Sequence, residues 1–236
     1  MTNARFSRRL TVGLFALASM LSPVSALAAS APATVVTSTS WAGYAATGST
    51  YTSVTTTFTV PKVTCPASST DGYADFWAGL DGYSSSSVEQ AGVAVECANG
   101  TADYYAWYEA YPANAVYLSN TVKVGDVITV TVAFSGTDTY TFTIENVTEG
   151  WTKIAKVASS GDKRSSAEII VEIPSGGSGV LPPAGFGELT FTGCKVDGDT
   201  LGSFDPTEIT SPGLTVSPIT GGTQFTVTEA KSPALG

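Results

Sequence analysis

The chain has 236 residues, with 20 acidic and 11 basic side chains and a formal net charge of −9. Such a negative surface disfavours nucleic acid and anionic membranes as partners. The sequence has no histidine, which excludes hydrolases with a histidine base and removes the commonest zinc ligand. An enzyme of this composition must use carboxylates, amides, hydroxyls or phenols, and we expect neither a metal site nor a cofactor.

Residues 1–28 have the features of a secretory signal peptide. Basic residues precede an apolar stretch at 10–21, and an A-x-A ending follows at 26–28. The apolar stretch is too short to span a membrane. We therefore expect a secreted, extracellular protein, with 29–39 as a short lead-in or pro-segment and 40–236 as a single domain. Loss of the signal, with its three arginines and no acidic residue, would change the net charge from −9 to −12.

From residue 51 onward, short runs of β-branched and aromatic residues alternate with clusters of Gly, Ser, Asp and Pro. No run of ten or more residues has convincing helical periodicity. The pattern is typical of an all-β domain, either an antiparallel sandwich or a barrel. The predicted strands lie at residues 51–60, 73–80, 87–97, 103–112, 126–134, 139–147, 151–158, 166–173, 189–196, 214–219 and 223–230.

The chain contains three cysteines, Cys65, Cys97 and Cys194. In an exported protein we expect two of them to form a disulfide and the third to be left over. We favour the pair Cys65–Cys97, because both flank segments that look like neighbouring strands or strand ends. The spacing alone leaves the other pairings open.

The segment DYYAWYEAYP, residues 103–112, places three aromatic rings around one carboxylate. On a strand, Tyr105, Trp107, Glu109 and Tyr111 share one face. This combination is unusual for a solvated face and for a core. It suits the wall of a groove that binds an extended polymer through ring contacts. The alternative is a sheet face with aromatic cross-strand pairs and one exposed glutamate.

The segment SAEIIVEIP, residues 166–174, also reads as a strand. Its odd-numbered side chains from 167 to 173 are apolar and should pack on a core, whereas Glu168 and Glu172 share the other face. Elsewhere, Gln90 is an amide with small or apolar neighbours on its own face. Asp81, at the end of a predicted strand, is most simply a turn-forming residue.

Taken together, several segments resemble the glutamic peptidases, or eqolisins, which are acid endopeptidases first known from fungi. Each match is short, but the matches follow the family's order from residue 40 to about residue 173. The matching segments are SWAGY (40–44), FTVP (58–61), WAGLDG (77–82), EQAG (89–92), YYAWYEAYP (104–112), GDVITVTV (125–132), IENVTEG (144–150) and AEIIVE (167–172).

The resemblance implies a β-sandwich of two large antiparallel sheets, of the concanavalin-like or jelly-roll type, with a catalytic glutamine and glutamate. The family's glutamine falls on Gln90 in EQAG, and its glutamate falls on Glu172, the second glutamate of AEIIVE. Glu168 is then expected to have a supporting or structural role. Further groove or supporting positions around this pair are Trp41, Trp77, Asp81, Trp107 and Glu109.

The chain departs from the family pattern at three positions. Ile169 stands where the family usually has Trp, Ala110 stands where the fungal proteins have Trp, and Glu89 replaces an apolar residue. We therefore expect differences in the shape of the substrate subsites. The lead-in is short compared with the fungal pro-segments, so control by a long propeptide is not expected. The export signal fits a bacterial member.

In the mechanism that the family suggests, Glu172 takes a proton from water and later protonates the leaving nitrogen. Gln90 donates an amide N–H to the oxyanion, a contribution of about 3–4 kcal/mol, and helps to position the water. Because a neutral amide does not repel a carboxylate, Glu172 should stay ionised in acid, aided by hydrogen bonds from Gln90. We expect protein or peptide substrates, a monomeric enzyme and an optimum at roughly pH 2–5.

Two alternatives remain at this stage. A glycoside hydrolase could use Glu109 and Glu172, or Glu168 and Glu172, as its carboxylate pair. A non-catalytic module for carbohydrate or peptide binding could have the same architecture. Gln90 discriminates between them, because the glycosidase scheme does not need it. A binding module, in turn, should not depend on the ionisation of Glu172.

Overall fold

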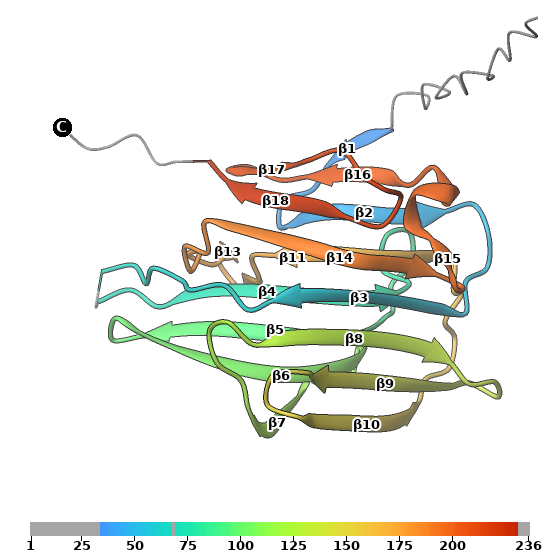
Figure 1. The fold of residues 1–236 in the computed structure, drawn as a ribbon, viewed down its shortest axis with the longest axis horizontal. Coiled ribbons are helices and arrows are strands. Elements are labelled where there is room, and N and C mark those ends of the chain that lie inside the picture. Colours follow the sequence, from blue (N-terminus) through green and yellow to red (C-terminus); the bar gives the residue numbers. More distant parts are fainter. Residues whose placement is uncertain (1–33, 68, 231–236) are drawn as a thin grey trace, which may run out of the picture. The chain divides into compact units, whose positions relative to one another are not determined.

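The computed structural model describes residues 34–67 and 69–230. Within these residues the chain forms two eight-stranded sheets and one small two-stranded hairpin. Figure 1 shows the two sheets as layers, one in front of the other, with their strands side by side. Neighbouring strands in the described residues are antiparallel, apart from the parallel pair β1 and β16. The predicted β-sandwich of two large antiparallel sheets is confirmed.

The first sheet has the order β1 (Val35–Thr37), β16 (Thr207–Thr210), β2 (Trp41–Thr47), β11 (Ser166–Glu172), β4 (Gly72–Leu80), β5 (Val88–Ala98), β6 (Thr101–Tyr111) and β7 (Val116–Thr121). The second has the order β10 (Trp151–Ala158), β9 (Thr139–Asn146), β8 (Val127–Phe134), β3 (Ser53–Thr59), β14 (Glu188–Val196), β18 (Phe225–Glu229) and β17 (Leu214–Val216), with β15 (Asp199–Thr200) paired to β14. The hairpin consists of β12 (Ser175–Gly176) and β13 (Gly179–Val180), and a 3₁₀ helix spans Leu201–Phe204. Among the described residues, no helix has the length and apolar character needed to cross a membrane.

The main core lies between the two sheets. Phe58 of β3 and Phe76 of β4 come from different sheets, and their rings meet edge to face with centroids 6.1 Å apart. Phe191 packs on the first ring and Phe186 on the second in the same manner. Each such pair adds about 0.5–1.5 kcal/mol to the stabilisation from buried area. The sheets are thereby fixed face to face, and the outer face of the first sheet is left to carry a site.

The alternation predicted for residues 166–174 is confirmed. The odd-numbered side chains from 167 to 173 belong to the main core. On the opposite face, Ile170 packs with Trp77 and Trp107 in a smaller apolar cluster. Glu168 is fully buried on this face, whereas Glu172 is only partly buried at the end of β11.

Strand β2, with the sequence WAGYAAT, is absent from the predicted strands although it lies inside the first sheet between β16 and β11. Alanine and glycine have low strand propensity, so the segment lacks the usual signal. A Cβ atom at Gly43 would lie 2.1 Å from the carbonyl oxygen of Ile169 in β11. Close approach of the neighbouring strand therefore selects glycine here, and this constraint is invisible in a propensity pattern.

Cys65 and Cys97 form a disulfide, as predicted, and Cys194 is a buried free cysteine. The predicted signal peptide, 1–28, lies outside the described residues. Within the predicted lead-in, 29–39, the described strand β1 pairs with β16. This part of the lead-in is thus a strand of the first sheet.

Candidate active site

Two pairs of polar residues lie on the outer face of the first sheet. Gln90 of β5 is directly opposite Glu109 of β6, and Glu172 of β11 is directly opposite Asp75 of β4. Gln90 also faces Gly79, four residues along β4 from Asp75. Side chains an even number of residues apart on a strand share a face. The register therefore brings the predicted catalytic residues together with two further carboxyl groups.

Two buried indoles, those of Trp77 and Trp107, lie in the row between these polar pairs. Gly92 of β5 stands between them in the register. A Cβ atom at Gly92 would lie 2.1 Å from the carbonyl oxygen of Phe76 and 2.8 Å from Cα of Trp77. Glycine at this position lets β4 and β5 approach closely, and the two indoles form an apolar row between the polar pairs.

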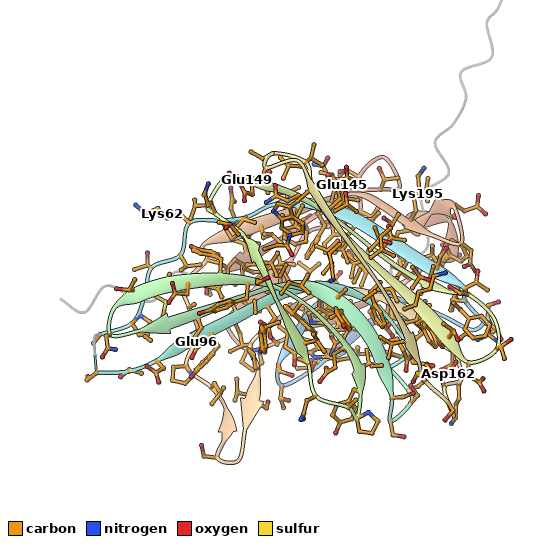
Figure 2. All side chains as sticks on the ribbon, turned by 90° about the horizontal axis from the view of Figure 1, so that it is seen from below. Lys62, Glu96, Glu145, Glu149, Asp162 and Lys195 are labelled. Atoms are coloured by element: carbon orange, nitrogen blue, oxygen red, sulfur yellow. A yellow bond between two sulfur atoms is a disulfide. The ribbon has the colours of Figure 1, made fainter. Side chains whose placement is uncertain are left out.

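The polar pairs line a cleft with a volume of about 480 Å³. No lysine or arginine is among its lining residues, all of which lie in the described part of the chain. Pro174 and Ser175, at the start of the β12–β13 hairpin, form part of its rim. In Figure 2 this hairpin projects from the same side of the sandwich as Glu96, opposite Glu145. The cleft is therefore acidic and is flanked by a projecting hairpin.

Aromatic side chains form much of the cleft wall. Trp107 and Tyr111, from the aromatic row predicted in residues 103–112, line it together with Trp41 and Tyr117. The ring of Tyr105 lies outside this lining and packs edge to face on Tyr117, with centroids 5.9 Å apart. Nε1 of Trp107 is buried without a hydrogen-bond partner in the described residues. The cleft thus offers ring faces and one free indole donor to an extended ligand.

Gln90 is held by Glu109. Nε2 of Gln90 donates a hydrogen bond to Oε2 of Glu109 over 2.7 Å. Because a side-chain amide nitrogen carries two hydrogens, a second donor position remains. Oε1 of Gln90 is buried without a hydrogen-bond partner in the described residues. Burial raises the pKa of Glu109, and the hydrogen bond from Gln90 lowers it. The contact therefore orients the amide and leaves part of its hydrogen-bonding capacity for a substrate.

Glu172 has a different partner. The indole Nε1 of Trp77 donates a hydrogen bond to Oε2 of Glu172 over 3.0 Å. Burial raises the pKa of Glu172, the indoles of Trp41 and Trp77 lower it, and the charge of Glu109 raises it. The expectation that Gln90 itself bonds to the Glu172 carboxylate is wrong, because the register pairs Gln90 with Glu109. The stabilising donors are indole N–H groups instead.

Asp75 is a cleft residue that sequence reasoning missed. Burial raises the pKa of Asp75 well above its usual range, and the charges of Glu172 and Glu109 raise it further. Alternation along YADFWAGL would have placed Asp75 on the same face as Trp77. Its position opposite Glu172 depends on the pairing of β4 with β11, which no local pattern specifies.

Three predicted site residues lie outside the cleft lining. One is Trp77, whose indole bonds to Glu172, and the others are the carboxylic residues Asp81 and Glu168. The carboxylate of Asp81 accepts the backbone N–H groups of residues 163–165 at 2.8, 2.6 and 2.9 Å. Oε1 of Glu168 accepts the backbone N–H of Tyr83 over 3.3 Å. Burial raises the pKa of Glu168 well above its usual range. Both side chains are thus engaged in holding loops, away from a ligand in the cleft.

Known proteins share this fold and sequence pattern. The model of the Peptidase A4 family matches residues 39–232. The chain is 34% identical to aspergillopepsin-2 of Aspergillus niger over 194 residues, which cover 72% of this chain and 69% of that protein. It is 33% identical to scytalidopepsin B of Scytalidium lignicola over 185 residues, which cover 72% and 68%.

Solved structures of glutamic peptidases also resemble this fold. The crystal structure of scytalido-glutamic peptidase with a transition state analogue inhibitor has a TM-score of 0.70 and 25% identity, covering 81% of this chain and 98% of that chain. The structure of aspergilloglutamic peptidase from Aspergillus niger has a TM-score of 0.61 and 30% identity, covering 67% and 99%. The chain belongs to the Peptidase A4 family and is a glutamic-type endopeptidase.

Proposed function

We propose that Gln90 and Glu172 are the catalytic pair with which this endopeptidase hydrolyses peptide bonds in acid. One observation carries the proposal: both side chains line a single aromatic cleft, and each is held by a different partner. Gln90 is bonded to Glu109, and Glu172 is bonded to Trp77. Because Gln90 and Glu172 are hydrogen-bonded to different partners, both can act on a substrate carbonyl that lies between them.

Glu172 is the general base in this scheme. Its carboxylate takes a proton from the attacking water and then transfers a proton to the leaving nitrogen of the scissile bond. Burial raises the pKa of Glu172, and the indoles of Trp41 and Trp77 oppose that shift. Activity should therefore decline as the pH falls through the pKa of Glu172, because the protonated acid cannot accept a proton from water.

Gln90 stabilises the oxyanion. The Nε2 hydrogen that is not engaged by Glu109 donates to the carbonyl oxygen as negative charge develops there, a contribution of about 3–4 kcal/mol. Oε1 of Gln90 accepts a hydrogen bond from the attacking water. Glu109 fixes the amide beforehand, so little reorganisation is needed when the reaction occurs.

The substrate is an extended segment of a protein or peptide. The cleft is walled by Trp41, Trp107, Tyr111 and Tyr117, whose rings suit contacts with apolar and aromatic side chains. The buried Nε1 of Trp107 can donate to a carbonyl of the bound chain. Ring contacts and this backbone contact together favour a peptide over a compact small molecule.

We further propose that the mature protein is secreted and acts as a monomer, without nucleic acid or membrane partners. The disulfide between Cys65 and Cys97 supports an oxidising location. The excess of acidic side chains opposes binding to nucleic acid and anionic membranes.

The glycosidase alternatives have less support. Glu168 is fully buried, so a pair of Glu168 and Glu172 has no common access to a sugar. Glu109 and Glu172 share the cleft, but Glu109 is engaged by the amide of Gln90. A glycosidase has no need of that amide.

The test is cleavage of a denatured protein across acidic pH by the wild type, Gln90→Ala and Glu172→Gln, with and without a pepsin-directed inhibitor. We expect cleavage by the wild type, resistance to the inhibitor, and a loss of about 10²–10³-fold in each variant. Gln224→Ala, in a turn before β18, is the matched control and should cleave normally. A folded Gln90→Ala protein that cleaves at the wild-type rate would rule out the proposed pair.

A further inference from the structure

Asp75 and Glu172 are direct cross-strand neighbours in the cleft. In such pairs the Cβ atoms lie about 4.5–5.5 Å apart. At this separation two carboxyl groups in a partly buried site interact strongly. The mechanism above uses Glu172 but gives no role to Asp75.

The surroundings of this pair contain no compensating cation. No lysine or arginine lines the cleft, whose lining residues all belong to the described chain. On the β2 side the neighbour of Glu172 is Trp41, which does not titrate. The titratable groups on the same face of the surrounding strands are Asp103, Tyr105, Glu109 and Tyr111 of β6, Tyr117 of β7, Glu96 of β5, Tyr73 of β4 and Glu168 of β11.

Two carboxyl groups placed in this way do not both ionise readily, so one of them retains a proton. Burial raises the pKa of Asp75 well above its usual range, and the charge of Glu172 raises it further. Burial raises the pKa of Glu172 as well, but the indoles of Trp41 and Trp77, which Asp75 lacks among its causes, lower it. In acid, the proton therefore resides on Asp75 and the negative charge on Glu172.

Building on the role proposed above for Glu172, we propose that Asp75 is a positioning residue that donates a hydrogen bond to the Glu172 carboxylate and confines activity to acid. An O–H donor to a carboxylate forms a bond about twice as strong as a neutral one. This bond holds the base ionised and oriented. When Asp75 loses its proton, the donor is lost, and a second negative charge opposes the developing oxyanion.

The test compares the pH dependence of kcat/KM for a peptide substrate in the wild type and two variants, from about pH 2 to about pH 8. Asp75→Asn keeps the size and a donor but cannot ionise. In the pH profile of this variant, the decline of kcat/KM on the high-pH side should shift to higher pH by roughly one unit or more, while the decline on the low-pH side stays in place. Asp75→Ala lacks the donor. The decline of its kcat/KM on the low-pH side should shift to higher pH, because Glu172 becomes easier to protonate.

Glu96→Gln is the matched control, since it removes one negative charge from an exposed position on the same face of the sheet. Screening should keep its profile within about 0.3 pH units of the wild type. Three results would overturn the proposal. These are an Asp75→Asn profile that overlays the wild type, an Asp75→Asn shift no larger than that of Glu96→Gln, and a folded Asp75→Asn protein that is inactive at every pH.

Carboxyl ¹³C NMR of the wild-type protein tests the same pair without any substitution. The proposal expects two coupled titration steps for Asp75 and Glu172, with Asp75 losing its proton at the higher pH. Independent titration of both groups near their ordinary values would contradict it. A wild-type protein that cleaves no peptide would remove the proposed function, and the titration would still decide whether the two carboxyl groups are coupled.

Discussion

Glu168 and Glu172 belong to the same strand and the same face of the first sheet, yet their environments differ. Glu172 lines the cleft, whereas Glu168 is fully buried. Each glutamate has acidic neighbours, and these form two groups of carboxyl side chains. The cleft cluster is Asp75, Glu109 and Glu172, and the buried cluster is Asp81, Glu89 and Glu168.

Both clusters contain carboxyl groups with raised pKa values. Burial raises the pKa of Glu89 to about 7 and that of Glu168 well above its usual range, just as it raises those of Asp75 and Glu172. A perturbed pKa therefore does not identify the catalytic group in this protein. The clusters differ in access to a ligand, because the buried cluster bonds to loops of the protein and the cleft cluster faces a groove.

The largest effect on stability is expected from the buried cluster, in Asp81→Ala. The Asp81 carboxylate accepts three backbone N–H groups and the hydroxyl of Ser165. Hydrogen bonds to a charged group contribute about 1.5–3 kcal/mol each, and we expect a loss of about 4 kcal/mol in the free energy of unfolding. Denaturant titration at acidic pH measures it.

Asp138→Ala is the control for this substitution. Asp138 is exposed and, like Asp81, has a positive φ, of 51° against 65°. Asp138→Ala therefore introduces the same backbone strain as Asp81→Ala, but it does not remove the loop contacts that Asp81 makes. A loss in Asp81→Ala no greater than in Asp138→Ala would show that the loop contacts are unimportant.

The buried cluster should also make the fold less stable toward neutral pH. The pKa of Glu89 is about 7 in the folded protein against a usual 4.5, so the folded state binds more protons between these values. Stability contributed in this way is complete below about pH 4.5 and is lost as the pH rises toward about 7. Thermal unfolding should show a falling Tm across this window and a smaller fall in Glu89→Gln. An equally steep fall in that variant would exclude Glu89 as a cause.

In the cleft cluster, Glu109→Leu should lower kcat about tenfold, or roughly 1.4 kcal/mol, with little change in KM. The substitution removes the acceptor that orients the Gln90 amide. Glu109→Gln retains an acceptor oxygen and should keep most of the activity. Steady-state kinetics of both variants tests this role, and equal losses in the two would argue against orientation of Gln90 by Glu109.

The smallest expected effect belongs to Trp77→Phe. Without the indole donor, the pKa of Glu172 should rise, so that less of the base is ionised at a given acidic pH. We expect a loss in kcat/KM of about threefold at the low-pH limb and almost none near the optimum. Trp151→Phe, whose indole donates to Thr121 on another part of the fold, should leave the profile unchanged. A uniform loss at all pH values would indicate damage to packing instead.

Alternation with a period of two was enough to predict most of the fold. It placed the odd-numbered residues of 167–173 in the core, and it put Glu168 and Glu172 together on the other face. Strand β2 was not predicted because its alanines and glycine have low strand propensity, and close contact with β11 is what requires glycine at residue 43. Local sequence patterns predict a strand where the side chains' own preferences determine the structure. They fail where contact with a neighbouring backbone determines which residue is allowed.

The candidate site was predictable only in part. The resemblance to glutamic peptidases selected Gln90 and Glu172, whereas periodicity could not separate Glu172 from Glu168. The difference between these glutamates comes from tertiary contacts, since Glu168 bonds to the backbone of Tyr83 and lies near Asp81. Asp75 was missed for a related reason. Its neighbour across the sheet depends on strand register, which the sequence of β4 does not encode locally.

The most direct test of the account compares kcat/KM for one peptide at acidic pH in Glu172→Gln and Glu168→Gln, corrected for the folded fraction. The substitutions are chemically identical, and they fall on one face of one strand. We predict a loss of about 10³-fold for Glu172→Gln and less than about threefold for Glu168→Gln. Comparable losses in the two variants, or a Glu172→Gln enzyme of nearly wild-type activity, would contradict the assignment of catalysis to the cleft.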